Sequence, residues 1–130
     1  MVIDTSAILA ILFQEPDAEH FAKAISNAST CLLSAANLVE AGIVVEARAG
    51  AAGTRDLDLL VAKSKIEVRP VTVKQAELAR LAFRKFGKGR HPAGLNFGDC
   101  FAYALASDTG EPLLFKGDDF NQTDIAVCPV

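Results

Sequence analysis

The chain has 130 residues, of which 51% are hydrophobic and 22% are charged, and its net charge is −3. This composition excludes a disordered chain, and no apolar run reaches the roughly 18 residues that a membrane-spanning helix requires. The slightly acidic balance also argues against a protein that coats nucleic acid without specificity.

Short apolar segments typical of buried strands alternate along the chain with longer segments of helical character. The expected strands are residues 2–3, 31–33, 66–70, 113–115 and 126–128. A helix that Thr5 or Ser6 caps is expected to run to Phe13. The other expected helices are residues 15–26, 35–49, 55–64, 72–86 and 97–107, with Ser34, Thr54, Thr72 and Asn96 at four of their starts. Gly50 fits the end of the third of these six helices.

This alternation predicts an α/β fold in which a parallel sheet is covered by helices on both faces. In such sheets, ligands bind outside the carboxyl ends of the strands, near the topological switch point. Residues that follow the strands directly are therefore the first candidates for chemistry.

Carboxylates stand at several of these positions. Asp4 follows the first expected strand, and Asp118 and Asp119 follow the fourth. Glu40 lies among apolar neighbours in the helix after the second strand, and Asp99 is the third residue of the helix that Asn96 caps. Each position also has a structural interpretation. These are a helix cap for Asp4, a capping box for Asp99, a turn for the adjacent pair and a solvated surface position for Glu40.

Together these acids favour a divalent cation, because carboxylates that converge without basic partners repel one another unless a cation lies among them. Oxygen ligands without organised His or Cys indicate Mg²⁺ or Mn²⁺ rather than zinc. His20 and His91 show no zinc-like spacing. The three cysteines, an odd number in no metal-ligand spacing, are interpreted as reduced side chains of a cytoplasmic protein.

A basic segment immediately precedes Asp99. Arg84, Lys85, Lys88 and Arg90 fall within seven positions that contain no acid, and glycines space the loop that follows. A local basic patch on an acidic chain indicates contact with phosphates. The alternative is a solvated helix end, where basic residues commonly gather because of the helix dipole.

The chain resembles the PIN-domain ribonucleases, specifically the VapC-type toxins of type II toxin–antitoxin pairs. The resemblance covers nearly the whole chain. It rests on MVIDTSAI at the start, the glutamate of SAANLVEA, the segment KFGKGRHPAGLNFGDCFAYALA, and LLFKGDDFNQTDI near the end. It implies one PIN domain over residues 1–130, with a three-layer α/β/α fold and a central parallel sheet of about five strands.

The resemblance also implies Mg²⁺- or Mn²⁺-dependent cleavage of RNA, neutralisation by a VapB-type antitoxin, and a homodimer. Asp4, Glu40 and Asp99 match the acidic metal-site positions of the family, and Thr5 or Ser6 matches a hydroxyl that positions water or metal. Many relatives carry a fourth acid where this chain has Gly117, so Asp118 or Asp119 is expected to replace it in the catalytic set. Lys85, Lys88 and Arg90 are expected to hold the RNA backbone.

Two other classes of protein share part of this pattern. A phospho-receiver domain has a similar length and an acidic metal pocket, but it requires an aspartate at the end of the third strand, where this chain reads Val-Arg-Pro. A PIN-like scaffold that binds RNA or protein without catalysis is the other alternative, because the fourth acid is displaced.

Overall fold

A computed structural model describes residues 1–129, and its centre is a parallel sheet with strand order β3-β2-β1-β4. The strands are β1 (Val2–Ile3), β2 (Cys31–Ser34), β3 (Ile66–Arg69) and β4 (Leu113–Leu114). The helices are α1 (Thr5–Leu12), α2 (Ala18–Asn27), α3 (Ala35–Lys63), α4 (Val73–Phe86) and α5 (Phe97–Thr109), with a 3₁₀ turn at Phe120–Gln122. None of the helices in this described part of the chain is long and apolar enough to cross a membrane.

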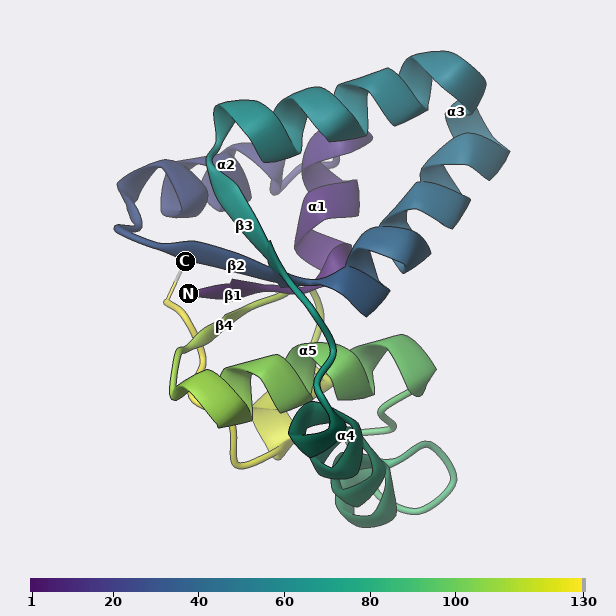
Figure 1. Ribbon diagram of the computed structural model, residues 1–130, viewed down its shortest axis with the longest axis vertical. Coiled ribbons are helices and arrows are strands. Elements are labelled where there is room, and N and C mark those ends of the chain that lie inside the picture. The colour runs from purple at the N-terminus through teal and green to yellow at the C-terminus, as the bar shows by residue number, and fades with distance from the viewer. Residues whose placement is uncertain (130) are drawn as a thin grey trace.

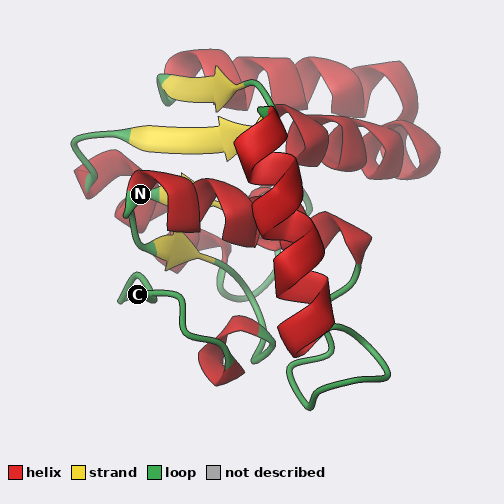
Figure 2. Ribbon diagram, turned by 60° about the horizontal axis from the view of Figure 1, so that its bottom comes forward, coloured by secondary structure: helices red, strands yellow, loops and turns green. Residues whose placement is uncertain are grey.

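Helices cover both faces of the sheet, so the expected three-layer α/β/α arrangement is confirmed (Figures 1 and 2). Successive strand residues point to opposite faces. Val2, Leu32 and Leu113 pack in one core cluster with residues of α4 and α5. Their neighbours Ile3, Leu33 and Leu114 pack in a second cluster with residues of α1, α2 and α3. Each such fully buried side chain contributes roughly 1.5–3 kcal/mol through removal of apolar surface from water.

Helix α3 consists of two arms that meet at Gly50, where the backbone leaves the helical region with φ 61° and ψ −150°. The break expected at Gly50 is confirmed, because glycine tolerates a positive φ that other residues resist. The second arm turns back beside the first (Figure 1). The expected cap at Thr54 is wrong: Thr54 lies inside the helix, and its hydroxyl donates to Glu46 Oε2 at 2.6 Å.

Other expected boundaries need correction near the ends of elements. The cap of α1 is Asp4, whose carboxylate accepts from Ser6 N, rather than Thr5 or Ser6. Helix α2 begins at Ala18 instead of residue 15. The fifth strand, expected at 126–128, is reduced to a single parallel bridge between Leu113 and Val127, so the sheet has four strands. The caps at Ser34, Thr72 and Asn96 are confirmed.

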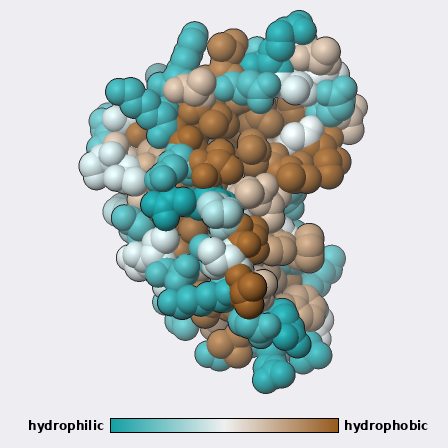
Figure 3. All heavy atoms as spheres, in the orientation of Figure 1, coloured by the Kyte–Doolittle hydropathy of each residue, from teal (hydrophilic) through white to brown (hydrophobic). Residues whose placement is uncertain are grey.

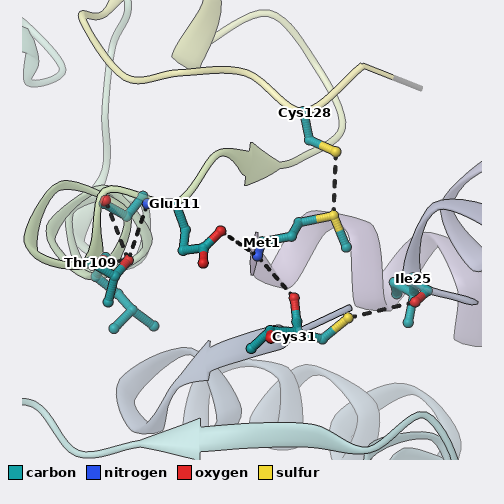
Figure 4. Close-up of polar contacts among 9 residues, drawn as sticks. Met1, Ile25, Cys31, Thr109, Glu111 and Cys128 are labelled. Atoms are coloured by element: carbon teal, nitrogen blue, oxygen red, sulfur yellow. Dashed lines mark hydrogen bonds and ion pairs between the residues drawn. The ribbon is translucent and has the colours of Figure 1, made fainter. Parts of the chain in front are cut away.

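The amino end of the sheet is fixed by the chain's first residue (Figure 4). The Met1 ammonium donates to Thr30 O and to Glu111 Oε2, both at 2.9 Å. Cys128 Sγ lies 3.3 Å from Met1 Sδ. Cys31, Cys100 and Cys128 are all free. These contacts hold the end of β1 that lies opposite its exit into Asp4.

Candidate active site

Asp4 lies at the carboxyl end of β1 and is almost completely buried, with an exposed fraction of 4%. Its Oδ2 accepts hydrogen bonds from Ser6 N at 3.0 Å and from Ser6 Oγ at 2.6 Å, so the capping role is real. Its Oδ1 is also buried but finds no hydrogen-bond partner among residues 1–129. Burial raises the pKa of Asp4 to about 7. The Ser6 bonds oppose this rise, and the charges of Asp99 and Glu40 add to it.

Asp99 lies in the first turn of α5 and forms the capping box that the sequence suggested. Its Oδ2 accepts from Asn96 N at 3.0 Å, and its own N–H donates to Asn96 Oδ1 at 2.9 Å. Burial raises the pKa of Asp99 to about 6, opposed by the Asn96 bond and supported by the charges of Asp119 and Glu40. Asp99 can therefore cap α5 and belong to the candidate site at the same time, because one carboxylate serves both roles.

Glu40 is held next to α5 by Asn37, a residue that the sequence interpretation missed. Asn37 is wholly buried, and its Nδ2 donates to Glu40 Oε1 at 3.3 Å and to Gly98 O at 3.0 Å. The Thr5 hydroxyl donates to the backbone carbonyl of Asn37 at 3.3 Å, so α1 contacts the start of α3 at this residue. The available signal was the i, i+3 spacing of Asn37 and Glu40, which places both side chains on one helix face.

Asp118 and Asp119 are both exposed, but their neighbours in the structure differ. The charge of Asp119 contributes to the raised pKa of Asp99. Asp118 instead accepts a long hydrogen bond from Asn121 Nδ2 at 3.5 Å. Asp119 is therefore the acid of this pair whose charge acts on Asp99.

Ser6 and Lys116 connect the exit of β4 to this region. The Ser6 hydroxyl, which donates to Asp4, accepts from Lys116 N at 2.9 Å. The Lys116 ammonium points elsewhere and pairs with Glu15 and Asp17. A receiver domain would need a lysine at its acidic pocket and an acid at the end of the third strand, but β3 ends in Arg69.

These acids have no basic partners: none of the ion pairs within residues 1–129 involves Asp4, Glu40, Asp99 or Asp119. In the described part of the chain, no three Asp, Glu, His or Cys side chains are grouped closely enough to hold one metal ion. Nevertheless, the buried, partnerless oxygen of Asp4 requires a cation or a proton. The donor set of oxygens fits Mg²⁺ or Mn²⁺.

The basic side chains lie on the last turn of α4 and the loop that joins it to α5. Lys85, Lys88 and Arg90 are exposed and take part in none of the ion pairs found in residues 1–129. Backbone bonds from Lys88 N to Leu95 O and from Leu95 N to Phe86 O, both 2.9 Å, close the loop. This loop leads directly into Asn96 and the helix that carries Asp99, and it projects from the body in both ribbon views (Figures 1 and 2).

Comparisons with known proteins agree with this fold. The family model of the PIN domain matches residues 1–126, and the chain therefore belongs to the PIN domain family. Within that family it groups with the VapC ribonucleases. Ribonuclease VapC30 of Mycobacterium tuberculosis is 52% identical over 126 residues, covering 97% of this chain and 96% of the relative. Ribonuclease VapC of Mycolicibacterium smegmatis is also 52% identical, covering 97% of this chain and 98% of the relative.

Solved structures show the same fold at much lower identity. The crystal structure of Mycobacterium tuberculosis VapC20, titled a sarcin-ricin loop cleaving toxin, matches with a TM-score of 0.80 and 15% identity over 98% of this chain and 97% of that one. VapBC2 from Rickettsia felis, bound to a promoter DNA fragment, matches with a TM-score of 0.71 and 16% identity over 97% of this chain and 94% of that one. The receiver interpretation has no support in these matches.

Proposed function

We propose that this chain is a metal-dependent endoribonuclease and the toxin of a VapBC toxin–antitoxin pair. The observation that carries the proposal is Asp4, a buried carboxylate with a partnerless oxygen and a pKa raised to about 7, with the charges of Asp99 and Glu40 close by. The names of its 52% identical relatives, all VapC ribonucleases, support the same activity. We further propose that residues 1–130 act as one PIN domain in the cytoplasm, where the three cysteines stay reduced.

Asp4, Glu40, Asp99 and Asp119 would hold Mg²⁺ or Mn²⁺. Such an ion lowers the pKa of a bound water and polarises a phosphoryl oxygen. The chain's own groups prepare this site before any ion binds. Ser6 fixes one oxygen of Asp4 and leaves the other free, and Asn37 orients Glu40. Thr5 would hold the backbone of α3 at Asn37, because its hydroxyl donates to the Asn37 backbone carbonyl and not to a carboxylate.

Lys85, Lys88 and Arg90 would hold the phosphate backbone of the RNA next to these acids. A site with several converging carboxylates repels a polyanion, so positive charge on the adjacent loop offsets that repulsion during association. The loop is continuous with α5, which places its cations and Asp99 on neighbouring segments.

The partner would be a VapB-type antitoxin, and the toxin itself would be a homodimer. Support comes from structural neighbours titled as complexes, including a toxin–antitoxin complex from Klebsiella pneumoniae with a TM-score of 0.73. An Arg or Lys of the antitoxin that reached these four acids of the toxin would pair with their carboxylates and block binding of the cation. Binding of the antitoxin should then abolish metal-dependent cleavage.

A PIN-like scaffold without catalysis is the second candidate. One observation favours it: among residues 1–129, no three acids are yet grouped as metal ligands. A scaffold would bind RNA or protein but neither bind Mn²⁺ tightly nor cleave.

The test is cleavage of total cellular RNA by the purified chain, free of antitoxin, in Mg²⁺, Mn²⁺ or EDTA. Asp99→Asn is compared with Asp56→Asn, a matched change at an exposed position on the second arm of α3. Discrete fragments that require metal and vanish only in Asp99→Asn support the nuclease. Absence of both cleavage and Mn²⁺ binding in the folded chain would overturn the proposal in favour of the scaffold.

A further inference from the structure

A second surface feature, between α4 and α5, takes no part in the proposed reaction. Helices α4 and α5 enclose an apolar cleft of about 560 Å³, here called the aromatic cleft. Phe83 of α4 and Phe97 and Phe101 of α5 supply its rings, with Ala76, Ala79, Arg80 and Cys100 as the remaining lining. Its lining is otherwise apolar, and its one cation, Arg80, pairs with Glu77 of the same helix.

Phe97 is the most unusual member of this cleft, because 80% of its surface is exposed. Its ring packs edge-to-face on Phe101, with 4.9 Å between ring centroids. Phe83 is also 40% exposed. Aromatic rings that share a cleft and remain open to solvent indicate a surface that binds something.

The charges around the aromatic cleft favour a polyanion. The Arg90 guanidinium lies 5.8 Å from the centre of the Phe83 ring, so the basic loop reaches the cleft directly. On the other side, Phe97 is separated from Asp99 by Gly98 alone. The cleft and Asp99 therefore share the first turn of α5.

The other large apolar groove has the opposite character. It lies in the crook between the two arms of α3, where apolar side chains gather (Figure 3), and its lining includes Leu38, Val39, Ile43 and Leu57. Glu46 and Asp58 also line it. Two acids and no cation make this groove unsuitable for nucleic acid, which leaves the aromatic cleft as the one that matches RNA.

We propose that the aromatic cleft takes an unpaired base of the RNA substrate, stacked on Phe97. The inference rests on the proposed nuclease function and specifies its substrate as RNA with an unstacked base at this position. Single-stranded loops present such bases, and aromatic side chains bind them by stacking. Every base has a π-face, so this contact demands an unpaired base and not a particular sequence.

The chain contains no tryptophan, so Phe97→Trp introduces a unique fluorescent reporter in the cleft. The probe is a single-stranded RNA 12-mer in EDTA, compared at equal salt with an abasic ribose-phosphate oligomer of the same length. We expect the RNA to quench the emission and the abasic oligomer to leave it unchanged. Leu59→Trp, half-exposed on the second arm of α3, is the matched control and should respond to neither.

Affinity provides a second, independent measurement. Phe97→Ala should weaken binding of the same RNA about tenfold without changing its salt dependence, and Phe97→Tyr should restore it. Equal responses to RNA and abasic oligomer, or unchanged affinity in Phe97→Ala, would overturn the inference. So would a change of Phe97→Trp emission with protein concentration alone, because a second copy of the chain would then fill the cleft.

The nuclease proposal and the stacking proposal can be overturned independently of each other. The fluorescence experiment is performed in EDTA and needs no cleavage, so a quench by RNA in a chain that never cleaves would overturn only the nuclease mechanism. Metal-dependent cleavage by the unaltered chain without any RNA-specific quench would overturn only the stacking site.

Discussion

Glu40 and Gly98 approach so closely that no other residue fits at position 98 without displacing the glutamate. A Cβ on Gly98 would lie 2.5 Å from Glu40 Cδ and closer still to Oε2. The Gly98 carbonyl meanwhile accepts from Asn37, which also donates to Glu40. The glycine next to Asp99 thus admits the Glu40 carboxylate to the acidic cluster, and the role of Gly98 is to leave space.

Gly98→Ala should therefore lower activity much more than stability. The new methyl group pushes the Glu40 carboxylate aside, and misplacement of a site group by about 1 Å can cost on the order of 100-fold in rate. Because Glu40 has a flexible side chain and alanine favours the helix, the free energy of unfolding should stay within about 1 kcal/mol of the original. Metal-dependent cleavage rate and thermal unfolding measure the two effects.

Gly42→Ala is the matched control on α3. A Cβ there would meet no heavy atom of residues 1–129 within 4 Å. It should keep full activity and gain up to about 1 kcal/mol of stability from helix propensity. Equal activity in both variants would show that the position of Glu40 does not matter for cleavage.

The sequence predicted the acids of the candidate site better than it predicted the residues that hold those acids in place. Asp4 and Asp99 were identifiable because each follows a strand or caps a helix in a recognisable local pattern, and both patterns depend on near neighbours. Asn37 was missed because its role depends on Gly98, which is 61 residues away in the chain. Likewise, the pattern placed a fifth strand at 126–128, but only one bridge forms there, since pairing with Leu113 is a property of tertiary packing.

The metal-free chain should lose stability as the pH rises from about 4 to about 7. The pKa of Asp4 is about 7 in the folded chain against 3.8 as its ordinary value, because burial disfavours the charged form. The folded state therefore binds the extra proton in this window, and its advantage is complete below pH 4 and lost above pH 7. Asp4→Asn removes the titration, so its stability relative to the original chain should increase with pH, by up to about 4 kcal/mol.

Denaturant unfolding in EDTA at several pH values measures this difference, with Asp56→Asn as the exposed control. Mn²⁺ should reverse the trend, because carboxylates must lose their protons to bind it. The gain in melting temperature on adding Mn²⁺ should be larger at pH 8 than at pH 5.5. A stability difference between Asp4→Asn and the original chain that is constant with pH would contradict the burial of a titrating Asp4.

Neutralising the basic loop should weaken RNA binding and reduce its salt dependence. The double variant Lys88→Ala with Arg90→Ala removes two exposed cations, so the slope of log affinity against log salt should fall by about 1.4 for a single strand. Removing Lys23 and Lys63, exposed on α2 and at the end of α3, changes the net charge equally at another place. An unchanged slope in the loop variant, measured by fluorescence anisotropy, would rule out phosphate contacts there.

The two adjacent acids after β4 should differ in function. Asp119 lies near enough to Asp99 to raise its pKa, whereas Asp118 bonds Asn121. Asp119→Asn should therefore weaken Mn²⁺ binding about tenfold through the loss of one ligand charge. It should also shift the acidic limb of the cleavage pH profile to lower pH, because the pKa of Asp99 falls when a neighbouring negative charge is removed. Asp118→Asn should leave both properties nearly unchanged, and an equal loss in both variants would mean that both acids contribute to the site.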